Sequence, residues 1–145
     1  GWRIGYLGGP QDIVNAVSNF QDHSTSNPVS ISQKAAVAAF NMPDTFSKEM
    51  TREFQKRRDY LAKRLDKMGK ISYVLPNGTF YIFCDISETK MDSLIFCTRL
   101  LDELLIAAIP GIAFGNDDYI RLSFATELKQ IEKGMDRLER WLGKV

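Results

Sequence analysis

The sequence is poor in the residues that build metal sites, disulfides and membrane spans. Its 145 residues include one histidine and two cysteines, and Cys84 and Cys97 form no CxxC pair. No apolar run approaches the ~20 residues that a membrane-spanning helix needs, and no signal peptide is visible. Each cysteine lies among apolar neighbours, where a small buried thiol is the ordinary interpretation. We therefore expect a protein of the reducing cytoplasm, with no metal site and no membrane contact.

Net charge is nearly absent as well. Nineteen Lys and Arg residues balance eighteen Asp and Glu, which leaves a formal net charge of +1. This balance gives no electrostatic case for nucleic acid as a partner. The basic run at residues 56–58 shares its segment with acidic side chains, so we interpret it as a solvated helix face. Neither a GxxxxGK[ST] loop nor a GxGxxG motif is present, which argues against the common nucleotide-binding folds.

The first half of the chain predicts one strand and three helices. Trp2–Leu7 alternates weakly between apolar and polar residues and ends at a glycine pair, which is typical of a strand. A helix is expected after Pro10, and another over 31–40, where Ser30 and Gln33 make a capping-box pattern. The second of these is almost wholly apolar, so we expect it to be buried on most sides. A long amphipathic helix is expected over 46–68.

The second half predicts an α+β arrangement. Strand-like runs at residues 71–75 and 79–86 flank Pro76-Asn77-Gly78, which is a turn signal. Asp92 or Ser93 is expected to cap a helix that ends near Leu105. Short strands over 107–109 and 119–125 follow, and a last helix is expected to be capped by Thr126. We expect the core face of the helix after Asp92 to consist of Leu94, Ile95, Leu101, Leu104 and Leu105.

Two arginines inside strand-like runs are the strongest chemical signals. In the run "YIRLSFA", period-two alternation places Ile120, Leu122 and Phe124 on one face and Arg121 on the other. An unpaired buried guanidinium costs several kcal/mol, so Arg121 needs an internal carboxylate, water or an anionic ligand. Arg3 lies between glycines that leave room for close approach of a ligand. An arginine fork suits a carboxylate or a phosphate, so both are candidate anion-binding residues.

Five segments resemble one family in its order and at about its spacing: "GWRIGY", "STSNP", "NGTFYIF", "PGIAFG" and "YIRLSFA". The family is the class I and II aminotransferases, pyridoxal-phosphate enzymes with the aspartate aminotransferase fold, and the resemblance covers essentially the whole chain. It implies an α/β fold in which residues 1–45 form the tail of the large cofactor-binding domain. Residues 46–68 would then be a connecting helix, and residues 69–145 a small α+β domain with helices packed on a small sheet.

The resemblance also implies roles for individual residues. In the family, the arginine of "GWRIGY" contacts the phosphate of the cofactor pyridoxal phosphate, so Arg3 is the expected cofactor-binding residue. The arginine of "YIRLSFA" holds the substrate α-carboxylate, which gives Arg121 its expected partner. Phe114 and the Gly78–Tyr81 hairpin are expected to line the substrate entrance. Ser26 and Asn27 lie in the segment that is placed at the homodimer interface in the family.

The Schiff-base lysine of the family is the notable departure. It precedes the Gly-Trp-Arg segment in a Ser-Lys motif, and Ser47-Lys48 is followed by no such segment. Because the chain opens at Gly1, inside a strand-like run, we expect further residues upstream and an isolated chain without catalytic activity. The implied reaction moves an amino group between an amino acid and a 2-oxo acid, with aspartate as one candidate substrate.

Other interpretations stay open at this point. One is a non-enzymatic α+β module for dimerisation or ligand sensing that shares only the strand–helix layout. Another is a lyase or decarboxylase that uses pyridoxal phosphate on the same fold, which only product analysis separates from an aminotransferase.

Overall fold

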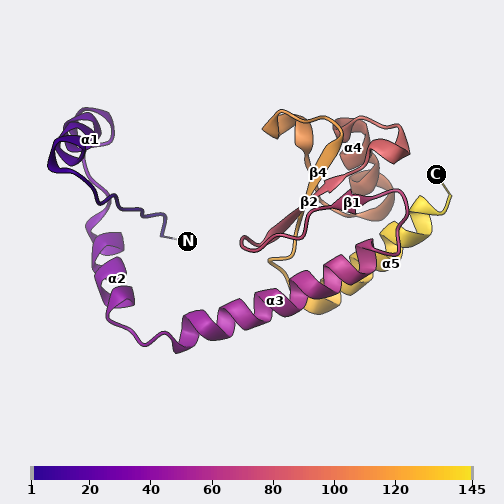
Figure 1. The fold of residues 1–145 in the computed structure, drawn as a ribbon, viewed down its shortest axis with the longest axis horizontal. Coiled ribbons are helices and arrows are strands. Elements are labelled where there is room, and N and C mark those ends of the chain that lie inside the picture. The colour runs from indigo at the N-terminus through magenta and orange to yellow at the C-terminus, as the bar shows by residue number, and fades with distance from the viewer. Residues whose placement is uncertain (1, 145) are drawn as a thin grey trace. The chain divides into compact units, whose positions relative to one another are not determined.

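The computed structural model describes residues 2–144 and contains two compact units, Gly1–Phe46 and Ser47–Val145. Figure 1 shows the ribbon with its elements labelled and coloured along the chain. The described residues form five α-helices and one four-stranded antiparallel sheet, so the fold class is α/β, as expected. The three-part division at residues 45 and 68 stays a prediction.

The first unit holds helices α1 (Gln11–Ser24) and α2 (Ser30–Phe40). The predicted strand at Trp2–Leu7 is wrong, because this segment has no regular structure. A strand needs a partner for its backbone hydrogen bonds, and the described residues of this unit contain no other strand. The Trp2 carbonyl instead accepts a hydrogen bond from the Ser32 hydroxyl at 2.9 Å, which fastens the segment to α2.

Helix α2 departs from its prediction in two ways. The capping box at Ser30 is wrong: Val29 is the N-cap residue, and the Gln33 side-chain amide donates to the Pro28 carbonyl at 2.8 Å. The expected burial is absent too, since Ser32 is the one buried residue of α2, and Phe40 is 71% exposed. The described residues do not supply the contacts that this apolar helix was expected to make.

The second unit is built on a sheet whose strands are β1 (Ser72–Tyr73), β2 (Tyr81–Asp85), β3 (Ile109–Pro110) and β4 (Tyr119–Ser123). Their order is β1-β2-β4-β3, and each neighbouring pair is antiparallel. The long pair β2–β4 places Phe83 opposite Arg121. The "YIRLSFA" segment is therefore a central strand, and its neighbours determine the surroundings of Arg121.

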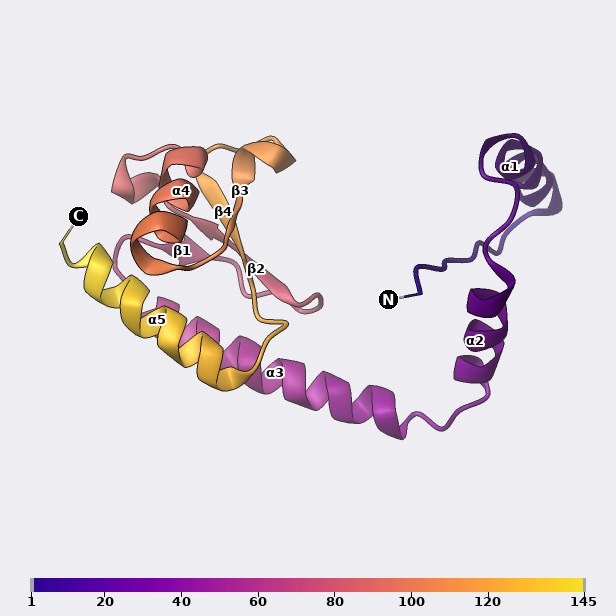
Figure 2. The same ribbon diagram turned by 180° about the vertical axis from the view of Figure 1, so that it is seen from behind.

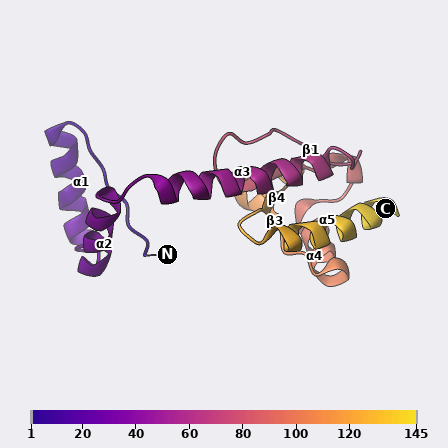
Figure 3. The same cartoon turned by 90° about the horizontal axis from the view of Figure 1, so that it is seen from below.

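Three helices cover one face of this sheet: α3 (Thr45–Leu65), α4 (Ser93–Leu104) and α5 (Leu128–Leu142). Helices α3 and α5 run side by side, as Figures 2 and 3 show from behind and from below. The Arg64 guanidinium joins them through Asp136 at 2.8 Å and Glu139 at 2.7 Å. Short 3-10 turns, η1 (Ser87–Thr89) and η2 (Gly111–Phe114), complete the unit.

Alternation along the strands fills the core from the sheet side. Ile82, Cys84 and Ile120 are fully buried, and Leu122 is nearly so, as the period-two pattern predicts. Phe124, just after β4, is buried, and the centroid of its ring lies 6.2 Å from that of Phe54 in α3. This packing leaves the alternate side chains, including Arg121, on the opposite face.

The predicted core face of α4 is wrong, although its start and its cap are right. Asp92 accepts a hydrogen bond from the Ile95 amide at 2.7 Å and so caps the helix. Leu94, Ile95, Leu101 and Leu105 are more than half exposed, and Leu104 is partly buried. The buried residues of α4 are Ser93, Phe96, Cys97 and Leu100.

Two smaller sequence expectations have different outcomes. The N-cap residue of α5 is Glu127, not Thr126, and it makes no side-chain capping bond. Cys84 and Cys97 are free and buried, as expected. Within residues 2–144, no helix has the length and apolar character that crossing a bilayer would require.

Candidate functional site

The face of the sheet that the helices leave uncovered carries aromatic residues around a single arginine. Strand β2 places Tyr81, Phe83 and Asp85 on this face, and β4 places Tyr119 and Arg121 beside them. All five are half-buried, in contrast to the fully packed residues that alternate with them. We call this surface the open sheet face.

Arg121 lies in the middle of the open sheet face and is held by rings. Its guanidinium carbon lies 5.0 Å from the centroid of Tyr81 and 5.0 Å from that of Phe114. Tyr81 comes from the neighbouring strand β2, whereas Phe114 comes from η2, after β3. No carboxylate among residues 2–144 forms an ion pair with Arg121. The guanidinium is therefore oriented by aromatic contacts, with no internal acid to neutralise it.

The acid that β2 contributes to this face is already engaged elsewhere. Asp85 accepts a hydrogen bond from the Ser87 amide at 2.8 Å. The Ser87 bonds hold the pKa of Asp85 below its ordinary value, and the Asp85 charge raises the pKa of Tyr119. The Phe83 ring stacks on Tyr119 at 4.9 Å, beside this pair. The Asp85 carboxylate therefore stabilises the turn that follows β2.

This arrangement suits the binding of a small planar anion. A guanidinium presents donors in a fixed fork that pairs with a carboxylate through two parallel hydrogen bonds. Rings that lie against the guanidinium cover it by cation–π contact and leave its donors for a ligand. The surroundings of Arg121 are therefore chemically suited to a carboxylate ligand.

The structure brings Phe114 against Arg121, while their roles at a substrate site stay a prediction, and it adds a residue that sequence reasoning missed. Tyr81 was assigned only to an entrance hairpin, yet its ring contacts the Arg121 guanidinium. The signal was present, because Tyr81 and Phe83 alternate at period two along β2. The pairing register, which the sequence does not reveal, decides that these rings share a face with Arg121.

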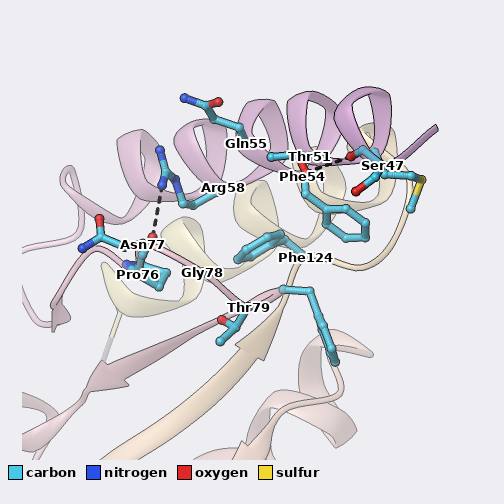
Figure 4. A pocket seen from close by; sticks show the side chains of 12 residues that line it. Ser47, Thr51, Phe54, Gln55, Arg58, Pro76, Asn77, Gly78, Thr79 and Phe124 are labelled. Carbon is cyan, nitrogen blue, oxygen red and sulfur yellow. Dashed lines mark hydrogen bonds between the residues drawn. The ribbon is translucent and has the colours of Figure 1, made fainter. Parts of the chain in front are cut away.

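The hairpin residues before Tyr81 line a separate groove of about 550 Å³ between α3 and the loop that precedes β2. Figure 4 shows Phe54 and Phe124 in this groove, with Arg58 donating to the Pro76 carbonyl at 3.1 Å. Arg121, Tyr81 and Phe114 are not among its lining residues. The groove is therefore distinct from the open sheet face.

The remaining sequence candidates lie in the first unit. Arg3 is exposed and has a φ of 53°, in the left-handed region that few non-glycine residues adopt. Ser26 has a φ of 61°, and its amide donates to the Gln21 carbonyl at 3.0 Å, just after the end of α1. Asn27 follows in the same exposed loop. Each occupies a loop from which its side chain reaches solvent.

Comparison with known proteins places the chain in a family. The family model described as aminotransferase class I and II matches residues 1–138. The chain belongs to this aminotransferase family. Its members depend on pyridoxal phosphate, and the donors of Arg3 suit the phosphate of that cofactor.

Individual relatives agree with this assignment. The chain is 39% identical to an aspartate aminotransferase of Bacillus subtilis (strain 168), over 99% of its own length and 38% of the relative's. It is 38% identical to an aspartate/prephenate aminotransferase of Nitrosomonas europaea, over 95% of its length and 38% of the relative's.

Solved structures agree as well. The crystal structure of the Thermotoga maritima aspartate aminotransferase matches with a TM-score of 0.88 at 37% identity, over 98% of this chain and 36% of that one. The aromatic aminotransferase of Pyrococcus horikoshii OT3 matches with a TM-score of 0.89 at 36% identity, over 99% and 39% of the two chains. The chain thus spans less than two fifths of the length of these relatives.

Proposed function

We propose that residues 1–145 form the C-terminal part of an aminotransferase that moves an amino group between an amino acid and a 2-oxo acid. Residues 1–45 would be the tail of its large domain, residues 46–68 its connecting helix and residues 69–145 its small domain. The observation that carries the proposal is Arg121, a half-buried guanidinium on a central strand with two rings against it and no described carboxylate partner. In this role Arg121 holds the α-carboxylate of the substrate.

Arg3 is the residue of this chain that we assign to the cofactor. Pyridoxal phosphate, when bound, supplies an electron sink for the bonds around the substrate α-carbon. The exposed guanidinium of Arg3 offers charge and a planar set of donors to the phosphate group. Gly5, two residues on, leaves open space around its backbone, which permits close approach of a ligand.

Aspartate is the substrate that we take as the first candidate, because the two relatives described above are an aspartate and an aspartate/prephenate aminotransferase. The matching Pyrococcus structure is an aromatic aminotransferase, so aromatic amino acids form the second group to test. The segment Asp22–Ser26 contains no arginine that would pair with a second substrate carboxylate. A panel of amino acids in a coupled assay, with analysis of the products, separates these substrates and distinguishes transamination from cleavage or decarboxylation.

We also propose a homodimer in which Ser26 and Asn27 lie at the interface, and a cytoplasmic location. The support for the interface is the exposed loop after α1, and the support for the location is the pair of free, buried cysteines. The 145-residue chain alone is proposed to be inactive. Its Ser-Lys pair, Ser47-Lys48, lies in α3 with no Gly-Trp-Arg after it.

The decisive experiment compares Arg121→Ala with Arg3→Ala in the complete enzyme. Loss of the contact between Arg121 and the substrate carboxylate should weaken substrate binding by about 2–5 kcal/mol. Arg121→Ala should therefore raise the substrate KM at least about thirtyfold while the cofactor stays bound. Arg3→Ala should instead weaken cofactor retention, measured by absorbance after dialysis. Normal kinetics of Arg121→Ala with every amino acid substrate would overturn the proposal.

A further inference from the structure

We infer that Tyr81 and Phe114 are positioning residues that hold the Arg121 guanidinium for the substrate carboxylate, and that a buried Ser93–Asp117 pair holds Phe114 in place. This inference rests on the proposed function, since it concerns how Arg121 is presented to its anion. It assigns Phe114, expected from the sequence to line the entrance, a role that acts through Arg121.

Rings supply the restraint on Arg121 that ion pairs supply for four other arginines of the second unit. The guanidinium groups of Arg57, Arg58, Arg64 and Arg99 each pair with a carboxylate at 2.6–2.9 Å. Arg121 has instead the two rings at 5.0 Å, which come from different sides of β4. A long, flexible side chain loses binding energy when it must be ordered by its ligand, so prior restraint by rings favours binding.

The position of Phe114 depends in turn on the turn that carries it. The Ser93 hydroxyl donates to Asp117 Oδ1 at 2.6 Å and accepts from the Ile112 amide at 3.2 Å. The Ser93 amide donates to the same Asp117 oxygen at 3.0 Å. Ser93 is fully buried, so these bonds are shielded from water. They fasten both ends of the turn that bears Phe114 to the start of α4.

Close backbone packing fixes the same turn from within. A Cβ on Gly111 would lie 2.3 Å from the Asn116 carbonyl oxygen and 2.3 Å from that of Tyr119. The chain therefore folds back tightly onto the start of β4, two residues before Arg121. Phe114 also meets the Phe83 ring edge-on at 5.9 Å, which limits its movement over the open sheet face. The turn, its ring and Arg121 form one connected unit.

The first test replaces each ring by leucine in the complete, cofactor-loaded enzyme. Phe114→Leu and Tyr81→Leu should each raise the substrate KM about threefold to tenfold, the loss expected for one cation–π contact in a partly desolvated site. The turnover number at saturating substrate should stay within about twofold. Phe114→Tyr, which keeps a ring, should restore the KM. Ile112→Ala, an exposed change in the same turn, is the matched control.

Propionate provides a readout that does not depend on the reaction. It carries a carboxylate but no amino group, so its competitive inhibition constant reports on the carboxylate site alone. This constant should rise in step with KM in both leucine variants and should be unchanged in Ile112→Ala. Phe114 is 52% exposed, so its replacement should not unfold the enzyme, which thermal melting checks.

The Ser93–Asp117 part is tested by a double-mutant cycle. Ser93→Ala removes the hydroxyl from its two partners and should raise KM and the propionate constant, whereas Thr98→Ala, on the exposed side of α4, should not. If Ser93 acts through the Phe114 ring, the double variant should be no worse in KM than Phe114→Leu alone. Fully additive effects would overturn this part.

The outcomes also separate this inference from the proposed function. In one outcome, Arg121→Ala raises the KM and the propionate constant, but both leucine variants keep these constants within twofold of the unmodified enzyme. The positioning role of the rings is then wrong, and the carboxylate-binding role of Arg121 stands. If Arg121→Ala changes neither constant, both are wrong. Rescue by Phe114→Tyr, together with a loss in Phe114→Leu, supports the positioning role.

Discussion

The two units of the chain differ sharply in what they bury. In the second unit, Phe96, Leu100 and Ile120 are fully buried in a core shared by three helices and a sheet. In the first unit, Tyr6, Phe20 and Phe40 are 84%, 76% and 71% exposed. Burial of apolar surface is the dominant favourable term in folding. The second unit therefore has its own source of stability, whereas the helices of the first have little from the described residues.

The largest expected contrast comes from removing one phenylalanine from each unit. Phe96→Ala should lower the free energy of unfolding by about 3–5 kcal/mol, because it leaves a cavity in the core beside Trp141. Phe20→Ala is the matched control and should change it by less than about 0.5 kcal/mol. Urea unfolding of the chain followed by circular dichroism measures both. Equal losses in the two variants would show that the first unit shares a core that the structure does not describe.

Glycine substitutions sharpen the contrast at the backbone. Gly111→Ala should cost about 1–3 kcal/mol, because its new methyl group meets two carbonyl oxygens of the turn that carries Phe114. Gly8→Ala, in the first unit, has open space around it and should be neutral to within about 0.5 kcal/mol. The same urea titration compares them. A neutral Gly111→Ala would mean that the turn is looser than the structure shows.

High pH should weaken the second unit through its buried thiols, of which Cys84 has the more strongly raised pKa. Burial raises the pKa of Cys84 from 9.0 to about 12, so the thiol ionises more readily in the unfolded chain. The contribution of the buried Cys84 thiol to the free energy of unfolding is complete below pH 9. It is lost as the pH rises from 9 towards 12. The part of the slope that Cys84 contributes should be at most about 1.4 kcal/mol per pH unit in this range, and Cys97, whose pKa burial raises to about 11, adds to the total. Urea titrations at several pH values measure it, and Cys84→Ala should reduce the slope; an unchanged slope in that variant would contradict the assignment.

The smallest free energies that we expect are those for local opening of single helices and strands. Amide hydrogen exchange should be fast in α1, which has no buried residue, and slow in the paired strands β2 and β4. Mass spectrometry of peptides from the exchanged chain resolves the two regions. Protection of α1 equal to that of β4 would erase the contrast between the units.

The sequence predicts most elements of the second unit because local chemistry and packing agree there. The Asp92 cap, the alternation of Ile120 and Leu122, and the long helix before the sheet follow from residue type and spacing. Trp2–Leu7 fails as a strand because pairing is a tertiary property: its sequence suits a strand, but the described residues of its own unit contain no other strand. A backbone pattern alone does not supply hydrogen-bond partners.

The exposed face of α4 could not be predicted for a related reason. Leu94, Leu101 and Leu105 form one apolar stripe and Phe96 and Leu100 another, and the spacing does not decide between them. The Ser93–Asp117 pair joins residues that are 24 apart, and no sequence signal marks it. Arg121 and Phe114 were predicted as candidate site residues because their segments resemble a family, whereas the contact of Tyr81 with Arg121 needed the β2–β4 register.

The most direct test of the central claim is a crystal structure of the complete, cofactor-loaded enzyme with succinate. We predict that one carboxylate of succinate accepts two hydrogen bonds from the Arg121 guanidinium, with the Tyr81 and Phe114 rings in contact with it. An Arg121 paired with a carboxylate of the protein, with succinate bound elsewhere, would contradict the account.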